Sequence, residues 1–151
     1  MIVMKAVPRY WTGEEIQRAD EIEIFYPDLH GIPHRGIVHS FQTGPMGVTG
    51  VNVIHNSKRN GGVGFISFAD FAQGSIVNVR RRAESPQHAA AIIARAESAI
   101  RHPYHWWLAN CEHFTDWCYT GKPGVSDTKR AGGSVAAGLA AVVLLWTSNT
   151  E

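Results

Sequence analysis

The hydrophobic pattern of this chain changes once along its length, at about Ser85. Before that residue, apolar side chains alternate with polar ones, as in DEIEIFYP at 20–27, and this period of two is typical of strands. After it, QHAAAIIARAESAIR at 87–101 carries alanine and isoleucine at the spacing of a helix. A chain in which strands come first and helices follow is typical of an α+β fold with an antiparallel sheet packed against helices.

The alternating part of the chain predicts a series of strands separated by turn residues, at 20–27, 34–41, 48–57, 63–67 and 75–81. Asn60-Gly61-Gly62 is a strong turn signal between the third and the fourth of these strands. A brief helical turn is expected to begin after Ser67, whose hydroxyl can cap it, and to end at Gly74.

Two longer helices are predicted in the second part of the chain. The first covers 86–101, with Ser85 as its cap and proline at its first position. The second covers about 111–119, with Asn110 as its cap. Polar residues at 122–130 then lead to an apolar end, so we expect one domain over 1–130 and a separate segment over 131–151.

Composition narrows the class of protein. Hydrophobic residues make up 44% of the 151 residues and charged residues 18%, which is typical of a globular domain. The net charge of +1 gives no support for nucleic acid as a partner. Residues 1–10 lack the apolar core of a signal peptide, and two cysteines do not form a disulfide framework, so a cytoplasmic setting is expected.

The segment at 131–146, AGGSVAAGLAAVVLLW, carries no charged residue. As a helix it would be ~24 Å long, whereas a bilayer core is ~30 Å thick, so it is short for a full span. Three interpretations stay open: a helix packed on its own domain, a partner-binding or shallow membrane helix, and a short membrane anchor.

Cys111 lies at the start of the second predicted helix. With Asn110 as the cap, its thiol is close to the unpaired backbone N–H groups and to the positive end of the helix dipole. Both effects favour the thiolate, and the N–H groups can also stabilise an oxyanion. Cys118, between two aromatic residues, is expected to be an inert core cysteine. We therefore interpret Cys111 as a candidate nucleophile.

A cysteine nucleophile needs a base, and the chain has eight histidines. His113 is two residues from Cys111 on the same helix, so its side chain is expected to point elsewhere. His34 and His55 lie on predicted neighbouring strands and can form a hydrogen bond if the register allows. One would then accept the thiol proton while the other holds its ring. His39 is a rival for the orienting role, although it is expected on the opposite face of its strand.

The motif NCEHF at 110–114 resembles the nucleophile motif of the lecithin:retinol acyltransferase-like family. That family includes the phospholipase A/acyltransferases and is a circularly permuted branch of the NlpC/P60 papain-like thiol hydrolases. DEIEIFYP at 20–27 resembles the family's first strand and HRGIV at 34–38 the strand that carries its general base. NVIHNS at 52–57 resembles the strand that supplies the second histidine, and the similarity covers roughly residues 20–128.

The resemblance implies that Cys111 is the nucleophile, His34 the general base and His55 its orienting partner. It implies a permuted NlpC/P60-like fold within the α+β class. It further implies acyl transfer or hydrolysis through an acyl-enzyme, with a lipid acyl donor or another ester or amide as substrate and without a metal or organic cofactor. The link DLHGIP at 28–33 is longer than in the family, which leaves the substrate class open. The segment at 131–146 matches the C-terminal hydrophobic anchor of the phospholipase-type members.

Two alternative functions stay open beside this one. The first is a peptidase or amidase, as in the wider NlpC/P60 group, which would use the same chemistry on an amide bond. The second is a non-catalytic protein that keeps the fold and binds a membrane or a protein partner.

Overall fold

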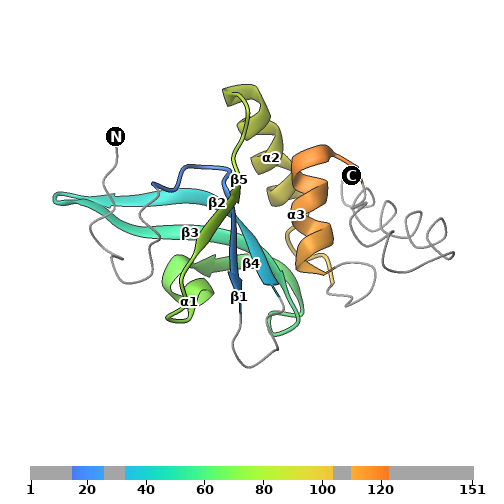
Figure 1. The fold of residues 1–151 in the computed structure, drawn as a ribbon, viewed down its shortest axis with the longest axis horizontal. Helices are drawn as coiled ribbons and strands as arrows, with labels where there is room; N and C mark the ends of the chain where they lie inside the picture. Colours follow the sequence, from blue (N-terminus) through green and yellow to red (C-terminus); the bar gives the residue numbers. More distant parts are fainter. Residues whose placement is uncertain (1–14, 26–32, 104–109, 123–151) are drawn as a thin grey trace, which may run out of the picture.

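The computed structural model describes residues 15–25, 33–103 and 110–122, which form one sheet and its covering helices (Figure 1). The strands are β1 (Glu21–Phe25), β2 (Pro33–Gly44), β3 (Gly47–Ser57), β4 (Gly62–Ser67) and β5 (Asn78–Arg81). The helices are α1 (Phe68–Ala72), α2 (Pro86–Ser98) and α3 (Cys111–Thr120). Strands precede the two longer helices, which confirms the predicted α+β class.

The five strands form a single sheet in the order β4-β3-β2-β1-β5, and all its pairs are antiparallel. The two longest strands, β2 and β3, make a hairpin that extends beyond the rest of the sheet at one end (Figure 1). At their other ends these strands carry His34 and His55, close to the start of β2 and the end of β3. The sheet thus brings two candidate site residues to one end of its central strands.

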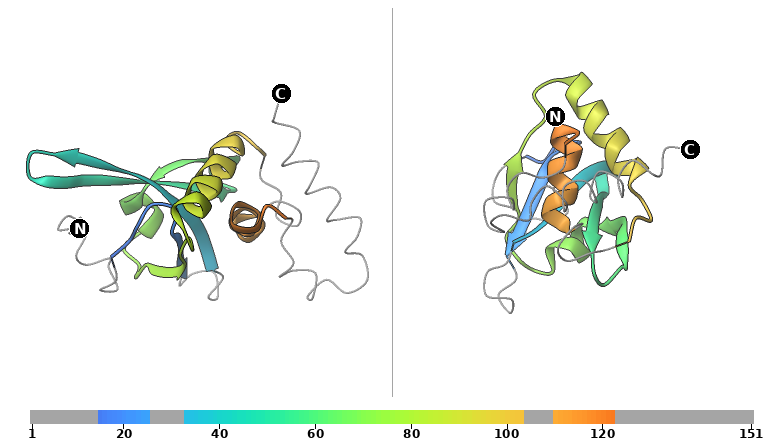
Figure 2. Two further views of the ribbon diagram at one scale, coloured as in Figure 1. Left: turned by 90° about the horizontal axis from the view of Figure 1, so that it is seen from above. Right: turned by 90° about the vertical axis from the view of Figure 1, so that its right-hand side faces the viewer.

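Each face of the sheet packs against different helices, because successive side chains of a strand point to opposite faces. Figure 2 shows α2 and α3 lying together, with α1 apart from them. Ile37 and Ile54 belong to the core under α2 and α3, which also contains Phe114 and Cys118. The neighbouring Val38 belongs to the second core, which is formed with α1. Cys118 is fully buried, as expected for a structural cysteine.

Local hydrogen bonds explain where the predicted helices begin. The Ser67 hydroxyl accepts a hydrogen bond from the Asp70 N–H and so caps α1. The Ser85 hydroxyl accepts one from the His88 N–H and caps α2. Both caps were expected from the sequence, because a serine oxygen satisfies a backbone N–H that the first turn of a helix leaves unpaired.

Three predicted boundaries were wrong. The cap of α1 at its C-terminal end is Gln73, with a φ of 49°, and not Gly74. The helix α2 ends at Ser98 and not at 101, because the backbone that follows it bonds to β4: the Arg101 N–H donates to the Val63 carbonyl. The strand β5 begins at Asn78 and not at 75, because its partner residues on β1 extend only from Glu21 to Glu23.

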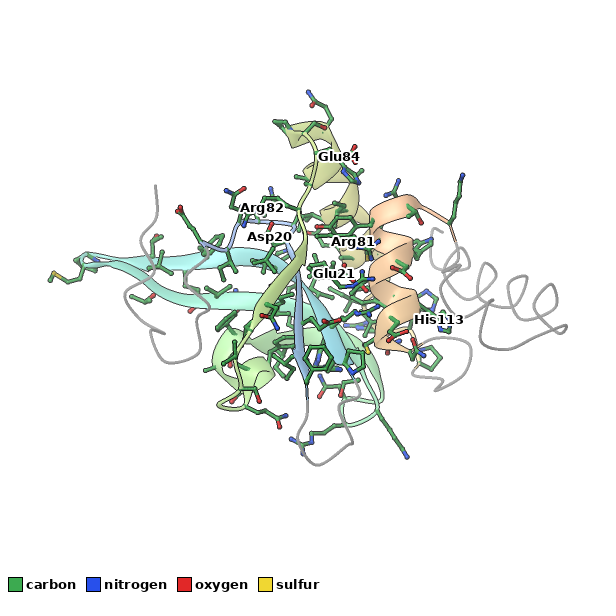
Figure 3. The ribbon with its side chains drawn as sticks, viewed as in Figure 1. Asp20, Glu21, Arg81, Arg82, Glu84 and His113 are labelled. Atoms are coloured by element: carbon green, nitrogen blue, oxygen red, sulfur yellow. The ribbon has the colours of Figure 1, made fainter. Side chains whose placement is uncertain are left out.

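A buried ionic network joins the edge strand β5 to β1 and α3. Glu21 is fully buried and accepts hydrogen bonds from the guanidinium groups of Arg80 and Arg81. Figure 3 shows Glu21 and Arg81 between the sheet and α3, where Arg81 also binds Asp116 of the helix. The Tyr119 hydroxyl of α3 accepts a further hydrogen bond from the Glu21 N–H. These bonds hold α3 against the sheet and thereby fix the position of Cys111 at its first residue.

The apolar segment predicted at 131–146 and the domain boundary predicted after residue 130 lie outside the described residues. In the part of the chain that the structure describes, no helix combines the length and the apolar character needed to cross a membrane.

Candidate active site

Cys111 is the first residue of α3, as the sequence predicts. Asn110 has extended backbone angles, and its side-chain Oδ1 accepts a hydrogen bond of 3.0 Å from the His113 N–H. The first backbone bond of the helix runs from the Phe114 N–H to the Asn110 carbonyl. The N–H groups of Cys111 and Glu112 therefore precede the helical hydrogen-bond ladder and lie next to the cysteine side chain.

The sulfur of Cys111 lies where β2 and β3 separate. Register pairs between these strands end at Gly36↔His55, although β2 begins earlier, at Pro33. The Cys111 Sγ is 3.7 Å from the Pro33 carbonyl oxygen, and the backbone N–H of Arg35 interacts with the same sulfur. Backbone groups two residues apart point to the same edge of a strand. The sulfur thus occupies the edge of β2 that β3 no longer covers.

Asn56 ties the end of β3 to the start of α3. Its side chain is buried, and its Nδ2 donates a hydrogen bond of 3.3 Å to the Asn110 carbonyl. The residue next to His55 thus contacts the residue next to Cys111. This contact fixes the start of the helix relative to the strand that carries His55.

The two predicted histidines form a hydrogen bond. The His34 Nε2 lies 2.8 Å from the His55 Nδ1, and the two rings meet edge to face with centroids 5.0 Å apart. His55 is 3% exposed, so this bond is protected from water on its side. Since Nε2 of His34 is bound to His55, the ring atom through which His34 would meet a substrate or a nucleophile is Nδ1.

Phe71 packs against both histidine rings from α1. Its ring centroid lies 5.3 Å from that of His34 and 6.1 Å from that of His55. The space for this ring exists because residue 36 is glycine: a Cβ at Gly36 would lie 3.0 Å from the Phe71 Cε2 and 2.7 Å from the Val53 Cγ1. The apolar ring therefore holds the imidazoles in place and desolvates them.

Asn60 completes the set of polar contacts around His55. Its side-chain Nδ2 lies 2.9 Å from the His55 Nε2, the ring nitrogen not used by His34. Asn60 belongs to the turn between β3 and β4, in which the Gly61 N–H donates to the Lys58 carbonyl. The turn thus folds back so that its amide reaches the strand that precedes it.

Burial lowers the pKa of both histidines. Desolvation, with a further contribution from repulsion by the protonated form of His55, lowers the pKa of His34 to about 4. Desolvation alone lowers the pKa of His55 to about 4. Both rings are consequently neutral at pH 7, and a neutral imidazole is the form that can accept a proton.

The thiol of Cys111 departs from the expectation of an activated thiolate. Desolvation raises the pKa of Cys111 to about 11, although the backbone N–H groups of Arg35 and Glu112 act in the opposite direction. The N–H groups lower the pKa of the thiol, as expected for a helix start. Desolvation raises this pKa by more, because the thiolate loses more stabilisation from water than the two N–H groups provide. In the resting protein the cysteine is therefore a neutral thiol.

An ion pair compensates the charges next to Cys111. The Arg35 Nε binds the Glu23 carboxylate at 2.7 Å, and its Nη2 lies 3.6 Å from the Glu112 carboxylate. Because Glu112 directly follows the cysteine, its negative charge raises the pKa of the thiol, while Arg35 lowers it. Arg35 thus offsets an acidic neighbour of the sulfur.

The other histidines have different partners. His39, the predicted rival for the orienting role, binds Glu97 of α2 through Nε2 at 2.7 Å and the Ser40 hydroxyl through Nδ1. His113 is buried on α3, and its backbone N–H donates to the Asn110 Oδ1 that caps the helix. His88 contacts the backbone carbonyl of Tyr119, so neither it nor His39 is joined to the His34–His55 pair. His30 and His105 lie outside the described residues.

Sequence reasoning missed two members of the site. The sequence indicates Asn60 only as a turn residue, and no local pattern shows that its side chain returns to His55. Arg35 was read only as part of the strand, and its interaction with the Cys111 sulfur comes from residues far apart in the chain. In the described ranges, no group of three His, Cys, Asp or Glu side chains is arranged to hold a metal ion.

Comparison with known proteins gives one family. The model of the family described as lecithin retinol acyltransferase matches residues 15–124, which contain every strand and helix described above. A search of curated proteins found no match.

Proposed function

Because the chain belongs to the lecithin retinol acyltransferase family, whose members are mostly thiol acyltransferases and phospholipases, we propose that it is a cysteine-dependent acyltransferase or hydrolase. The membership also identifies the α+β domain as an NlpC/P60-like fold. In this proposal Cys111 is the nucleophile, His34 the general base and His55 the residue that orients it.

One observation carries the proposal: the His34 Nε2 is hydrogen-bonded to the His55 Nδ1, and the Cys111 sulfur contacts the backbone of Pro33 and Arg35, the residues on either side of His34. A nucleophile, a base and a group that orients the base are the parts that covalent acyl transfer needs. Both imidazoles are neutral at pH 7 because burial lowers the pKa of each, so each has a ring nitrogen with a lone pair.

The first half-reaction forms a thioester. The Cys111 sulfur bonds to the carbonyl carbon of the substrate, the S–H proton passes to the His34 Nδ1, and the carbonyl electron pair moves to the oxygen. The intermediate then collapses with cleavage of the bond to the leaving alcohol, which takes the proton from His34. Because burial raises the pKa of the thiol, proton transfer accompanies the attack and does not precede it.

The second half-reaction releases the acyl group. Water or an acceptor alcohol or amine gives its proton to His34 and attacks the thioester carbonyl, and the returning proton restores the Cys111 thiol. The N–H groups of Cys111 and Glu112, at the start of α3, are suited to stabilise the oxyanion in both halves. Hydrolysis and acyl transfer thus differ only in which nucleophile reaches the thioester.

The proposed substrate is a lipid ester, with a glycerophospholipid as the acyl donor. Family membership supports this class. The segment at 131–146 agrees with it, because an apolar end would bring the domain to a lipid surface. A peptide or amide substrate would use the same chemistry and is therefore a separate arm of the test.

The test is mass spectrometry of the intact protein after incubation with phospholipid vesicles, and in a second arm with a peptide pool. We expect a mass increase of one acyl chain on Cys111 in the lipid arm. Cys118→Ala should retain the adduct and Cys111→Ala should lose it. An adduct only in the peptide arm would overturn the lipid assignment, and no adduct in either arm would overturn the enzymatic function.

A further inference from the structure

The His34–His55 pair continues into a third residue. His55 is bound through Nδ1 to the His34 Nε2 at 2.8 Å and through Nε2 to the Asn60 amide at 2.9 Å. Among the described residues, these two are the hydrogen-bond partners of His55, and its ring packs against the rings of His34 and Phe71. Which ring nitrogen of His55 carries the proton therefore depends on His34 at one end of this chain of hydrogen bonds and on Asn60 at the other.

A chain of two neutral imidazoles can be polarised in only two directions, because each ring donates through one nitrogen and accepts through the other. If the amide of Asn60 donates to His55, then His55 donates to the His34 Nε2, and the His34 proton lies on Nδ1. If Asn60 accepts from His55, then His55 accepts from His34, and the His34 Nδ1 carries a lone pair. Only the second direction gives His34 a basic Nδ1.

We propose that Asn60 is a positioning residue whose side-chain oxygen accepts a hydrogen bond from the His55 Nε2–H and thereby keeps the His34 Nδ1 unprotonated. This inference rests on the proposed function, in which His34 takes the proton of Cys111. The structure places the Asn60 Nδ2 at 2.9 Å from the His55 Nε2, and turning the amide by 180° puts Oδ1 in nearly the same position, so either end of Asn60 fits this contact. The chemistry required of His34 selects the oxygen.

The same direction of the hydrogen-bond chain, with Asn60 as the acceptor, is needed after the Cys111 proton has moved to His34. Once His34 has accepted the proton of Cys111 it carries N–H groups on both ring nitrogens, and its Nε2–H needs an acceptor on His55. With Asn60 as an acceptor, the His55 Nδ1 provides it. With Asn60 as a donor, two N–H groups would face each other across 2.8 Å in a buried site. No proton passes to Asn60 in this scheme.

The location of Asn60 suits this role. The His55 side chain is 3% exposed whereas Asn60 is exposed, so the amide reaches the Nε2 of the buried His55 ring from the surface. Gly64, the residue paired with His55 on β4, leaves the space above the strand open, since a Cβ there would lie 4.0 Å from the Asn60 Nδ2. The backbone of Asn60 is outside the positive-φ region, so other residues fit there without strain.

The first experiment reads the tautomers directly. In protein labelled with ¹⁵N-histidine, two-bond ¹⁵N–¹H correlations at neutral pH distinguish protonated from unprotonated ring nitrogens. We expect His34 and His55 each to carry the proton on Nε2, and Asn60→Ala to shift both residues to a mixture of tautomers. Asn60→Asp, which can only accept, should keep the wild-type pattern. A His34 proton on Nδ1 in the wild type, or unchanged tautomers in Asn60→Ala, would overturn the proposal.

The second experiment measures acylation of Cys111 by p-nitrophenyl butyrate. We expect Asn60→Ala to lower the acylation rate constant roughly 10-fold, a part of what general-base catalysis contributes, while KM changes little. Asn60→Asp should stay within about 3-fold of the wild type. Arg59→Ala, in the same exposed turn, is the matched control and should be unchanged. Equal rates in Asn60→Ala and the wild type would contradict the proposal.

The two experiments separate this inference from the proposed function. If the wild-type protein is not acylated by any substrate, the proposed function fails, yet the tautomers still show whether Asn60 sets the direction of the chain. If acylation occurs and the tautomers do not respond to Asn60, the proposed function stands and the role of Asn60 falls.

Discussion

The Cys111 Sγ lies 3.7 Å from the carbonyl oxygen of Pro33, on the edge of β2 from which β3 has already separated. The start of a helix and the start of a strand therefore meet at the half-buried Cys111 side chain. The sulfur gains the backbone N–H of Arg35 and is partly desolvated. Both effects determine how the thiol reacts.

Alkylation of Cys111 should depend steeply on pH. Because desolvation raises the pKa of this thiol to about 11, the rate constant with iodoacetamide should keep rising through the alkaline range. It should not level off near the ordinary value of 9.0. Cys118 is fully buried, and burial also raises its pKa, so it should react after the half-buried Cys111. Peptide mapping separates the two sites, with Cys118→Ala as the control, and a plateau at neutral pH would contradict the raised pKa.

The histidine pair should make the protein sensitive to mild acid. The pKa of both His34 and His55 is lowered from 6.5 to about 4, so between these values the unfolded chain binds protons that the folded protein does not. The free energy of unfolding is then highest above pH 6.5 and falls as the pH drops towards 4. Urea denaturation across this range measures the effect.

The matched variants for this experiment are His34→Gln with His55→Gln, which should flatten the pH dependence, and His39→Gln, which should not. The buried Glu21 acts in a separate range, because the arginines beside it lower its pKa below 4.5. An unchanged slope in the double glutamine variant would show that other groups are responsible.

Gly36→Ala should destabilise the fold and displace Phe71 from the histidine pair. The added methyl group would lie 2.7 Å from the Val53 Cγ1 and 3.0 Å from the Phe71 Cε2, and overpacking of this kind costs about 1–3 kcal/mol. Gly64→Ala is the control on β4, where the nearest atom would be 4.0 Å away. Thermal or urea denaturation compares the two. Equal stability would mean that the core around Phe71 adjusts freely.

Arg81→Met should be among the most destabilising single changes. It leaves the fully buried Glu21 with Arg80 as its ion-pair partner and removes the bond to Asp116 of α3, and loss of one partner from a buried ion pair costs about 3–5 kcal/mol. The double variant Glu21→Gln with Arg81→Met should recover part of the loss, because no unpaired carboxylate stays buried. Chemical denaturation of the three variants tests this, and full additivity would contradict the coupling.

The apolar segment at 131–146 should promote binding to lipid. Partition onto phospholipid liposomes should be strong for the full chain and weak for a chain that ends at Arg130, because burying apolar side chains in the interface drives the binding. Sedimentation with the liposomes measures the bound fraction. Equal partition of the two chains would favour a helix packed on its own domain.

Local patterns predicted much of the fold. The alternation in EIEIF and in the two longest strands, and the serine and asparagine caps of α1, α2 and α3, depend on residues that are neighbours in the sequence. The ends of α2 and β5 could not be predicted in this way. Arg101 leaves the helix because its N–H bonds to the Val63 carbonyl, and β5 pairs with β1 only from Glu21 to Glu23, although β1 continues to Phe25.

The candidate site likewise has features that the sequence predicts and features that only the folded structure shows. That Cys111 begins a helix capped by Asn110 follows from adjacent residues, and the sequence alone determined it together with the α+β class and the family resemblance. Only the tertiary structure decided that His34 bonds His55, that Asn60 is the second partner of His55, and that burial raises the pKa of the thiol. The reason is physical: strand register, ring orientation and desolvation depend on groups brought together by folding, and no local pattern encodes them.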